Sequence, residues 1–164
     1  MTADLAIELV NDGSRRRAGE SIALKGVYTN ASARPLALTF WWNRTMRVLD
    51  AQGRVVPPGA GPVLPCGVAE EWSVLEPGGK LERDEPLGCT QPAGRSEPIG
   101  WSYALAPGTY RVVLVHESPP PHGFTQSSPD ARAFRGRVES NEVALAIEEP
   151  EPRKPGFFSR LLGG

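Results

Sequence analysis

Residues 105–116 have the sequence Leu-Ala-Pro-Gly-Thr-Tyr-Arg-Val-Val-Leu-Val-His and contain the strongest β-forming run of the chain. A Pro-Gly turn leads directly into alternating apolar side chains, with Tyr110, Val112 and Leu114 on one face and Val113 and Val115 on the other. Apolar residues on both faces predict a strand that is covered on both sides. A turn, a tyrosine and then such a strand are typical of the tyrosine corner of an immunoglobulin-like sandwich.

The composition favours one domain built from many short strands. The chain has 164 residues, and its 18 glycines and 17 prolines separate short apolar runs. A formal net charge of −1 gives no general attraction to nucleic acid or to anionic lipid. No apolar run approaches the ~20 residues of a membrane span, and the first ten residues lack the layout of a signal peptide. We therefore expect a cytoplasmic protein.

Other runs of alternating residues lie on both sides of this central strand. They are expected to form strands at 5–9, 21–30, 35–42, 45–49, 54–56, 70–75, 80–87 and 143–147. The turn at 50–53 predicts a hairpin between 45–49 and 54–56, and the turn at 76–79 predicts one between 70–75 and 80–87. Gly26 predicts a bulge or a close packing contact. The neighbours Trp41 and Trp42 must face opposite sides, so one is either covered by a loop or part of an exposed aromatic patch. The predicted fold is a single all-β, immunoglobulin-like antiparallel β-sandwich of seven to nine strands, spanning residues 1–148.

Several of these segments together resemble a bacterial immunoglobulin-like module of the intracellular proteinase inhibitor type. The matching pieces are Tyr28-Thr-Asn30 with Pro35-Leu-Ala-Leu38, Arg47-Val-Leu-Asp50 with Gly53-Arg-Val-Val56, Leu75-Glu-Pro-Gly78 and Pro107-Gly-Thr-Tyr110. The resemblance covers most of residues 20–116. It implies the sandwich fold and raises proteinase inhibition as a function, but it assigns no inhibitory residue to this chain.

The sequence predicts neither an enzyme nor a metal or cofactor site. His116, expected at the end of a strand, and His122, in a loop, do not have zinc-ligand spacing, and neither Cys66 nor Cys89 belongs to a Cys-x-x-Cys pair. No Gly-x-Ser-x-Gly elbow or phosphate-binding loop is present. An enzyme using Cys66 or His116 is kept only as an alternative to be tested. Whether the two cysteines form a disulfide stays open. The arginines at 15–17 are expected to form an exposed basic turn.

The C-terminal residues carry the most specific functional signal. Residues 149–155 are charged and contain proline, which predicts a flexible linker, and residues 156–164, Gly-Phe-Phe-Ser-Arg-Leu-Leu-Gly-Gly, form a short amphipathic segment. One or two helical turns would gather its four apolar side chains on one side. Their burial would yield roughly 6–12 kcal/mol, which the cost of ordering nine residues at about 1.5 kcal/mol each offsets in full. The segment therefore requires a preformed binding groove, several copies acting together, or its own sandwich to rest on. The predicted partner-binding residues are Phe157, Phe158, Arg160, Leu161 and Leu162.

Four interpretations of this tail stay open: docking to a partner protein, packing on its own domain, weak contact with a membrane surface, and a ubiquitin-like Leu-Leu-Gly-Gly terminus. The leading hypothesis is a non-enzymatic binding or adaptor module that docks to a partner protein through the tail. The alternative is a proteinase inhibitor that presents the irregular stretch 117–133, with its three prolines at 119–121, to a protease cleft.

Overall fold

A computed structural model of the chain describes residues 4–13, 15–40, 43–58, 72–88, 101–118 and 132–149. All regular structure within these ranges is β-strand, which confirms the expected all-β class. Nine of the strands have four or more residues, and the other four have only two. The expected number of seven to nine strands therefore matches the longer strands alone. The strands are β1 (Leu5–Asn11), β2 (Arg16–Arg17), β3 (Leu24–Asn30), β4 (Leu36–Thr39), β5 (Arg44–Leu49), β6 (Val55–Val56), β7 (Trp72–Leu75), β8 (Lys80–Asp84), β9 (Leu87–Gly88), β10 (Trp101–Ser102), β11 (Gly108–Ser118), β12 (Gly136–Glu139) and β13 (Val143–Glu148).

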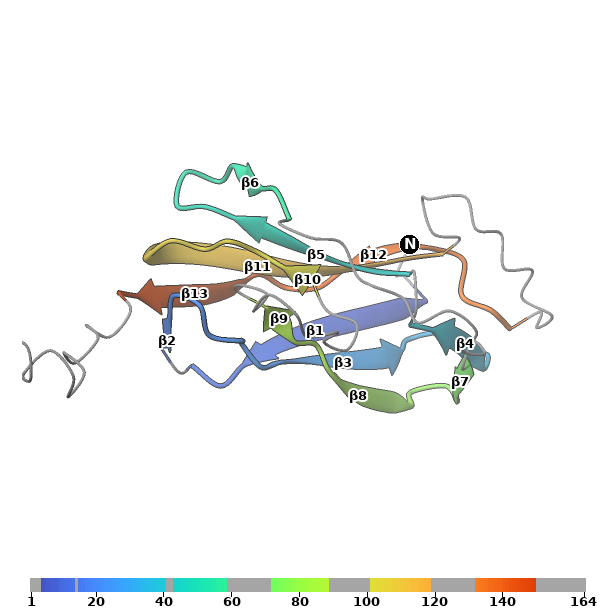
Figure 1. Cartoon of the computed structure of the whole chain (residues 1–164). Helices are drawn as coiled ribbons and strands as arrows, with labels where there is room; N and C mark the ends of the chain where they lie inside the picture. Colours follow the sequence, from blue (N-terminus) through green and yellow to red (C-terminus); the bar gives the residue numbers. More distant parts are fainter. Residues whose placement is uncertain are drawn as a thin grey trace, which may run out of the picture.

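The strands form two layers with the hydrophobic core between them (Figure 1). One layer has the order β1-β3-β8, and the other has the order β2-β13-β11-β5-β6 with β12 also paired to β11. Two small sheets, β4-β7 and β9-β10, complete the described strands. Pairing is antiparallel except between β9 and β10 and between β2 and β13, which are parallel. Strands of both layers contribute apolar side chains to one core, as in a β-sandwich.

The central strand predicted from the sequence is β11. It pairs with β5 along one edge and with β13 and then β12 along the other. Val112 and Leu114 point into the core, and Val113 and Val115 are buried on the opposite face, which confirms a strand covered on both sides. His116 does not end the strand as expected, because β11 continues to Ser118 and the His116 side chain lies in the interior.

Most of the N-terminal strands are also confirmed. Side chains of β1 alternate strictly between buried and exposed from Leu5 to Val10, and Ile22, Leu24 and Tyr28 are all buried on one face. Of the two possibilities for Gly26, close packing is the right one, because the pairing of β3 with its neighbours continues through this residue without a bulge. A Cβ at Gly26 would lie only 3.1–3.2 Å from side-chain atoms of Tyr28, Glu85 and Leu114.

The predicted hairpin around residues 76–79 is wrong. The turn itself forms, with the Gly79 amide donating to the Glu76 carbonyl at 2.7 Å, but β7 pairs with β4 whereas β8 pairs with β3. Asn30 separates the two ladders, because its side-chain amide donates to the Leu75 carbonyl and its backbone N–H donates to the Gly79 carbonyl. The chain therefore passes from one ladder to the other at this turn.

The expected basic turn at residues 15–17 is wrong in part. Arg16 and Arg17 form the short strand β2, which pairs in parallel with Ile147 and Glu148 of β13. Arg15 makes an ion pair with the Glu148 carboxylate at 3.1 Å, and Arg16 pairs with Asp12 at 2.9 Å. The Arg15 side chain and the backbone of Arg16 and Arg17 therefore bind β13, the last strand of the chain.

Several expectations lie outside the described residues. They concern the tryptophan pair at 41–42, the two cysteines at 66 and 89, the stretch 119–131, and the linker and tail beyond residue 149. In the part of the chain that the structure describes, no helix has the length and apolar character needed to cross a bilayer.

Candidate functional site

The predicted partner-binding residues Phe157, Phe158, Arg160, Leu161 and Leu162 lie outside the described residues. The structure shows where the segment that carries them begins. β13 is paired up to its last residue, and the Ala18 amide donates to the Glu148 carbonyl at 3.0 Å. The C-terminal segment therefore starts from a fixed point at the end of β13, which lies between β2 and β11 in the upper layer of Figure 1.

His116 is the one residue of the enzyme alternative that the structure describes. Its side chain is 1% exposed, and its ring packs against those of Tyr28, Phe40 and Phe134 at centroid distances of 5.7–6.1 Å. Burial, and then the positive charge of Arg44, lower the pKa of His116 from 6.5 to about 3, so the ring is neutral near pH 7. A substrate cannot reach this ring without opening the core, and Cys66 and His122 lie outside the described residues.

A buried charged group that the sequence did not predict lies beside His116. The Glu85 carboxylate accepts a hydrogen bond from the Tyr28 hydroxyl at 2.9 Å and forms an ion pair with the Arg44 guanidinium. Arg44 also donates to the Phe40 carbonyl at 2.7 Å, and the Arg83 guanidinium lies over the Phe40 ring at 4.3 Å from its centroid. We call Tyr28, Arg44 and Glu85 the buried triad.

The buried triad joins both layers of the sandwich. Tyr28 is on β3, Arg44 is the first residue of β5, and Glu85 follows β8 and is only 4% exposed. Burial, and then the Glu85 carboxylate, raise the pKa of Tyr28 well above its ordinary value, so its hydroxyl remains a hydrogen-bond donor. The Glu85 side chain is 5% exposed and that of Arg44 14%, so little of this ion pair is open to a solute. Among the described residues, no three His, Cys, Asp or Glu side chains come together in a group that could hold a metal ion.

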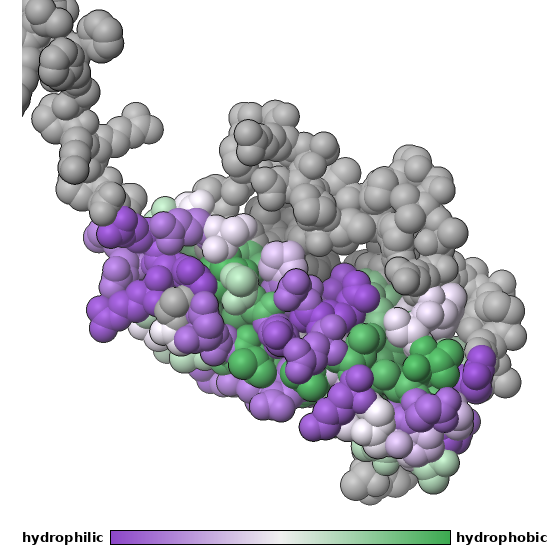
Figure 2. Space-filling view, turned by 90° about the horizontal axis from the view of Figure 1, so that it is seen from below, coloured by the Kyte–Doolittle hydropathy of each residue, from purple (hydrophilic) through white to green (hydrophobic). Residues whose placement is uncertain are grey.

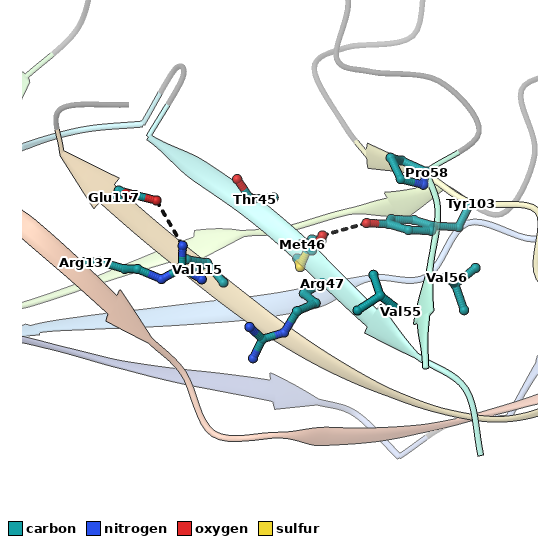
Figure 3. A pocket seen from close by; sticks show the side chains of 10 residues that line it. All are labelled: Thr45, Met46, Arg47, Val55, Val56, Pro58, Tyr103, Val115, Glu117 and Arg137. Atoms are coloured by element: carbon teal, nitrogen blue, oxygen red, sulfur yellow. Dashed lines mark hydrogen bonds and ion pairs between the residues drawn. The ribbon is translucent and has the colours of Figure 1, made fainter. Parts of the chain in front are cut away.

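An accessible site lies on the other side of β11, on the outer face of the upper layer. It is a pocket of about 280 Å³ over β5 and β11 (Figure 3). Figure 3 shows Val55, Val56, Pro58 and Tyr103 around one end and Glu117 and Arg137 at the other. Its lining residues are Thr45, Met46, Arg47, Val55, Val56, Pro58, Tyr103, Val115, Glu117 and Arg137. Most of this lining is apolar, which suits an apolar side chain or a small apolar ligand.

Fixed elements position the walls of this pocket. The β5–β6 hairpin forms as predicted, and its turn brings Val55 opposite Leu49. The Tyr103 hydroxyl donates to the Met46 carbonyl at 2.6 Å, which holds the aromatic wall against β5. Burial raises the pKa of Tyr103, so this hydroxyl stays protonated.

The charged end of the pocket is an ion-pair network. Arg47 donates to Glu139 at 3.1 and 2.7 Å, and Arg137 donates to Glu139 at 2.8 Å and to Glu117 at 3.1 Å. Hydrogen bonds from Arg47 and then Arg137 hold the pKa of Glu139 below its ordinary value, and the bond to Glu139 raises the pKa of Arg137. A ligand in the pocket therefore meets charges that are already paired.

The two ends of the predicted inhibitory stretch 117–133 are attached to the scaffold. Glu117 and Ser118 pair with Arg137 and Gly136 across the β11–β12 ladder. At the other end, the Phe134 amide donates to the Ala37 carbonyl at 3.0 Å, and the Ala37 amide donates to the Arg132 carbonyl at 3.0 Å. Both ends of the stretch are thus held by backbone hydrogen bonds.

Only one wall of this pocket could be predicted from the sequence. The alternation of β11 predicted buried residues on its outer face, and Val115 is one of them. The rest of the pocket comes from β5, β6, β12 and the segment before β11, which no local pattern brings together. No protein-family model matches this sequence, and no curated protein matches it either.

Proposed function

We propose that the protein is a non-enzymatic binding or adaptor module that docks to a partner protein through its C-terminal hydrophobic peptide. The observation that carries the proposal is the attachment of β13, whose final residue Glu148 is held by backbone pairing and by Arg15. Four apolar side chains follow within fourteen residues of this fixed point, at 157, 158, 161 and 162. Such a segment needs a preformed groove on a partner, because ordering it costs at least as much as its burial yields.

We further propose that the sandwich belongs to the immunoglobulin-like group. The support is Tyr110, whose hydroxyl donates to the Ala106 carbonyl four residues upstream at 2.9 Å. A tyrosine at the start of a central strand that bonds back to the preceding corner is a hallmark of immunoglobulin-like sandwiches. The same likeness, with the sequence resemblance to the proteinase inhibitor type, supports the alternative function below.

Deletion of residues 156–164 is expected to abolish capture of the partner and to change the free energy of unfolding by less than about 0.5 kcal/mol. The fold should survive because the described strands end at Glu148. Capture is measured by pull-down from cell lysate with mass spectrometry, followed by titration of the purified partner. Phe157→Ala/Phe158→Ala should behave like the deletion, with Ser159→Ala as the matched control.

The same peptide fused to an unrelated carrier should capture the same partner. Undiminished capture by the truncated chain, or no capture by the fused peptide, would refute the proposal. Unfolding curves of the truncated chain separate loss of binding from loss of structure.

The alternative is a proteinase inhibitor that presents the stretch 117–133 to a protease cleft. The observation that favours it is the attachment of both ends of this stretch, by the β11–β12 ladder on one side and by Ala37 on the other. A loop with anchored ends on a rigid scaffold can bind with a small loss of conformational entropy.

If this alternative is right, the protein should titrate a serine protease at a ratio of one to one and remain intact. Glu117→Ala breaks the ion pair with Arg137 at the base of the loop and is expected to weaken inhibition about three- to tenfold with little loss of stability. Lys25→Ala, which breaks the exposed pair with Glu82, is the matched control. Rapid cleavage within 117–133 without inhibition would exclude the inhibitor function.

A further inference from the structure

One edge of the lower layer is open. In the order β1-β3-β8, β8 pairs with β3 on one side only, and Figure 1 shows it as the outermost strand of that layer. The Asn30 amide donates to the Gly79 carbonyl at 3.0 Å, so the backbone of Gly79 and of every second residue after it points toward β3. The N–H and C=O groups of Lys80, Glu82 and Asp84 therefore point away from β3. No other described strand pairs with them.

The opposite edge of this layer is closed by a side chain. The Asn141 amide group donates to the Leu9 carbonyl at 3.0 Å and accepts from the Leu9 N–H at 2.8 Å, as the backbone of a neighbouring strand would. A strand added along β1 would have to displace Asn141. Of the two edges, β8 is thus the one that can accept a strand without the loss of these bonds.

An inward-facing cation lies on the open edge. Arg83 is half-buried, and its guanidinium lies over the Phe40 ring at 4.3 Å from the centroid. Its Nε is buried and has no hydrogen-bond partner among the described residues. The carboxylates nearest in sequence do not serve it, because Glu82 and Glu85 are engaged in other ion pairs and Asp84 faces the opposite side of the strand. A partly buried cation without an anion is costly, so this position favours a carboxylate supplied by a ligand.

Arg83 makes the edge selective. An inward-pointing charge on an edge strand opposes unspecific pairing, because most added strands would place an apolar or a cationic side chain against it. In an antiparallel addition, the residues opposite Leu81 and Arg83 would form the close, non-hydrogen-bonded pairs, with Cβ atoms about 4.5–5.5 Å apart. A carboxylate opposite Arg83 would gain charge-assisted hydrogen bonds. An apolar side chain opposite Leu81 would extend the core, against which Leu81 already packs.

The outer face of β8 adds a second charge pattern. Lys80 at one end and Asp84 at the other are both exposed, so an added strand is favoured when it carries an acid opposite Lys80 and a base opposite Asp84. Figure 2 views the molecule from the side on which β8 lies and shows apolar patches between hydrophilic surface. This surface suits a strand that alternates charged and apolar side chains.

We propose that β8 binds an extended peptide segment of another protein by adding it as an antiparallel strand, with a carboxylate of the peptide opposite Arg83. Along the peptide, the favoured order is a base opposite Asp84, the acid opposite Arg83, a polar residue opposite Glu82, an apolar residue opposite Leu81 and a second acid opposite Lys80. Main-chain hydrogen bonds supply the affinity, and the carboxylate supplies the specificity.

The first test titrates the full-length chain with the synthetic peptide acetyl-Thr-Lys-Glu-Thr-Val-Glu-Thr-amide, followed by competition with a fluorescent copy. Arg83→Gln is expected to weaken binding at least about tenfold, as is replacement of the first glutamate of the peptide by glutamine. Arg54→Gln removes an exposed cation that pairs with Asp50 in the β5–β6 turn, and as the matched control it should leave the affinity unchanged. Equal affinities of Arg83→Gln and wild type would overturn the proposal.

The second test determines whether the peptide pairs as a strand. N-methylation of its central threonine removes an N–H that would point at Glu82 and should abolish binding. N-methylation of the valine, whose N–H would point away from β8, should leave the affinity unchanged. Equal effects of the two methyl groups would show that the peptide binds through its charges alone, which contradicts strand addition.

Amide hydrogen exchange identifies the edge that is used. In the free protein, the amides of Lys80, Glu82 and Asp84 should exchange fast and those of Leu81 and Arg83, which are bonded to β3, slowly. The peptide should slow exchange of the first three at least about tenfold. Protection of these three in the free monomer would show that another part of the chain already pairs with β8, and protection that grows with dimerisation in sedimentation velocity would assign the edge to a second copy. Either result would overturn the proposal.

The tail takes no part in this binding. Truncation after residue 155 should leave the affinity for the peptide unchanged, whereas it should abolish capture by the tail. The two proposals can therefore fail independently. A loss of peptide binding on truncation would place the peptide on the tail and contradict its addition to β8.

Discussion

Replacement of Glu85 with alanine is expected to lower the free energy of unfolding by about 3–5 kcal/mol. The carboxylate is 4% exposed and is the partner of both the Arg44 guanidinium and the Tyr28 hydroxyl. Its removal leaves a guanidinium inside the core with no carboxylate to neutralise it, next to a second cation, Arg83. The unfolded chain suffers no such loss, because water solvates both arginines there.

Urea unfolding followed by tryptophan fluorescence measures this loss. Glu82→Ala is the matched control, because Glu82 pairs with Lys25 at the surface with a side chain that is 63% exposed, and its loss should cost less than about 1 kcal/mol. Glu85→Gln should fall between the two, since an amide oxygen still accepts the Tyr28 hydrogen bond but carries no charge.

The double variant Glu85→Leu/Arg44→Met separates the cost of an unpaired charge from the value of the pair. A buried ion pair exchanged for apolar side chains of similar volume is often neutral or stabilising. The double variant is therefore expected to regain most of the stability that Glu85→Ala loses. Equal losses in Glu85→Ala and Glu82→Ala would show that the buried triad is not enclosed in solution.

The parts of the fold that the sequence predicted well depend on alternation within one strand. Val112 and Leu114 are buried in the core because strand geometry places every second residue on one face, whatever the neighbouring strands are. The β5–β6 hairpin was predictable for a similar reason, since its turn residues Asp50 and Gly53 are local. Hydrogen bonds to the Arg54 and Gln52 amides lower the pKa of Asp50, as is usual for a turn aspartate.

The errors arise where partners are far apart in the sequence. The turn at residues 76–79 has the composition of a hairpin turn, but Asn30, some 45 residues earlier, directs its two strands into different ladders. Glu85 is adjacent to the exposed Asp84, and nothing in the local sequence distinguishes which of the two carboxylates meets Arg44. The pocket is formed by five segments that are separate in the sequence, so no local pattern predicts it and the three-dimensional structure is needed to see it.

Acidification from pH 7 to pH 5 is expected to lower the free energy of unfolding by about 2 kcal/mol through His116 alone. The folded state keeps this ring neutral, with a pKa of about 3, whereas the unfolded state takes up a proton near pH 6.5. Above pH 6.5 both states are neutral and the residue contributes no pH dependence. Below it the unfolded state binds more protons, so stability falls steadily until the pH reaches about 3.

The physical origin of this effect is the surroundings of the ring. Aromatic rings of Tyr28, Phe40 and Phe134 pack around His116, and Arg44 is the nearby cation that opposes a second positive charge. Among the described residues, Nδ1 of His116 has no hydrogen-bond partner. Glu85, the nearest acidic member of this group, is already engaged by Arg44 and Tyr28.

The measurement compares wild type with His116→Phe in urea unfolding at half-unit steps from pH 7 to pH 5. Phenylalanine keeps the ring packing and removes the titratable group, so the variant should lose about 2 kcal/mol less over this range. Because His122 and all the carboxylates are present in both proteins, their own titrations cancel in the difference. Parallel pH profiles would mean that folded His116 accepts a proton near its ordinary pKa. Because burial is the larger cause of the lowered pKa, that result would require the ring to be open to solvent, which would contradict its packing against Tyr28, Phe40 and Phe134.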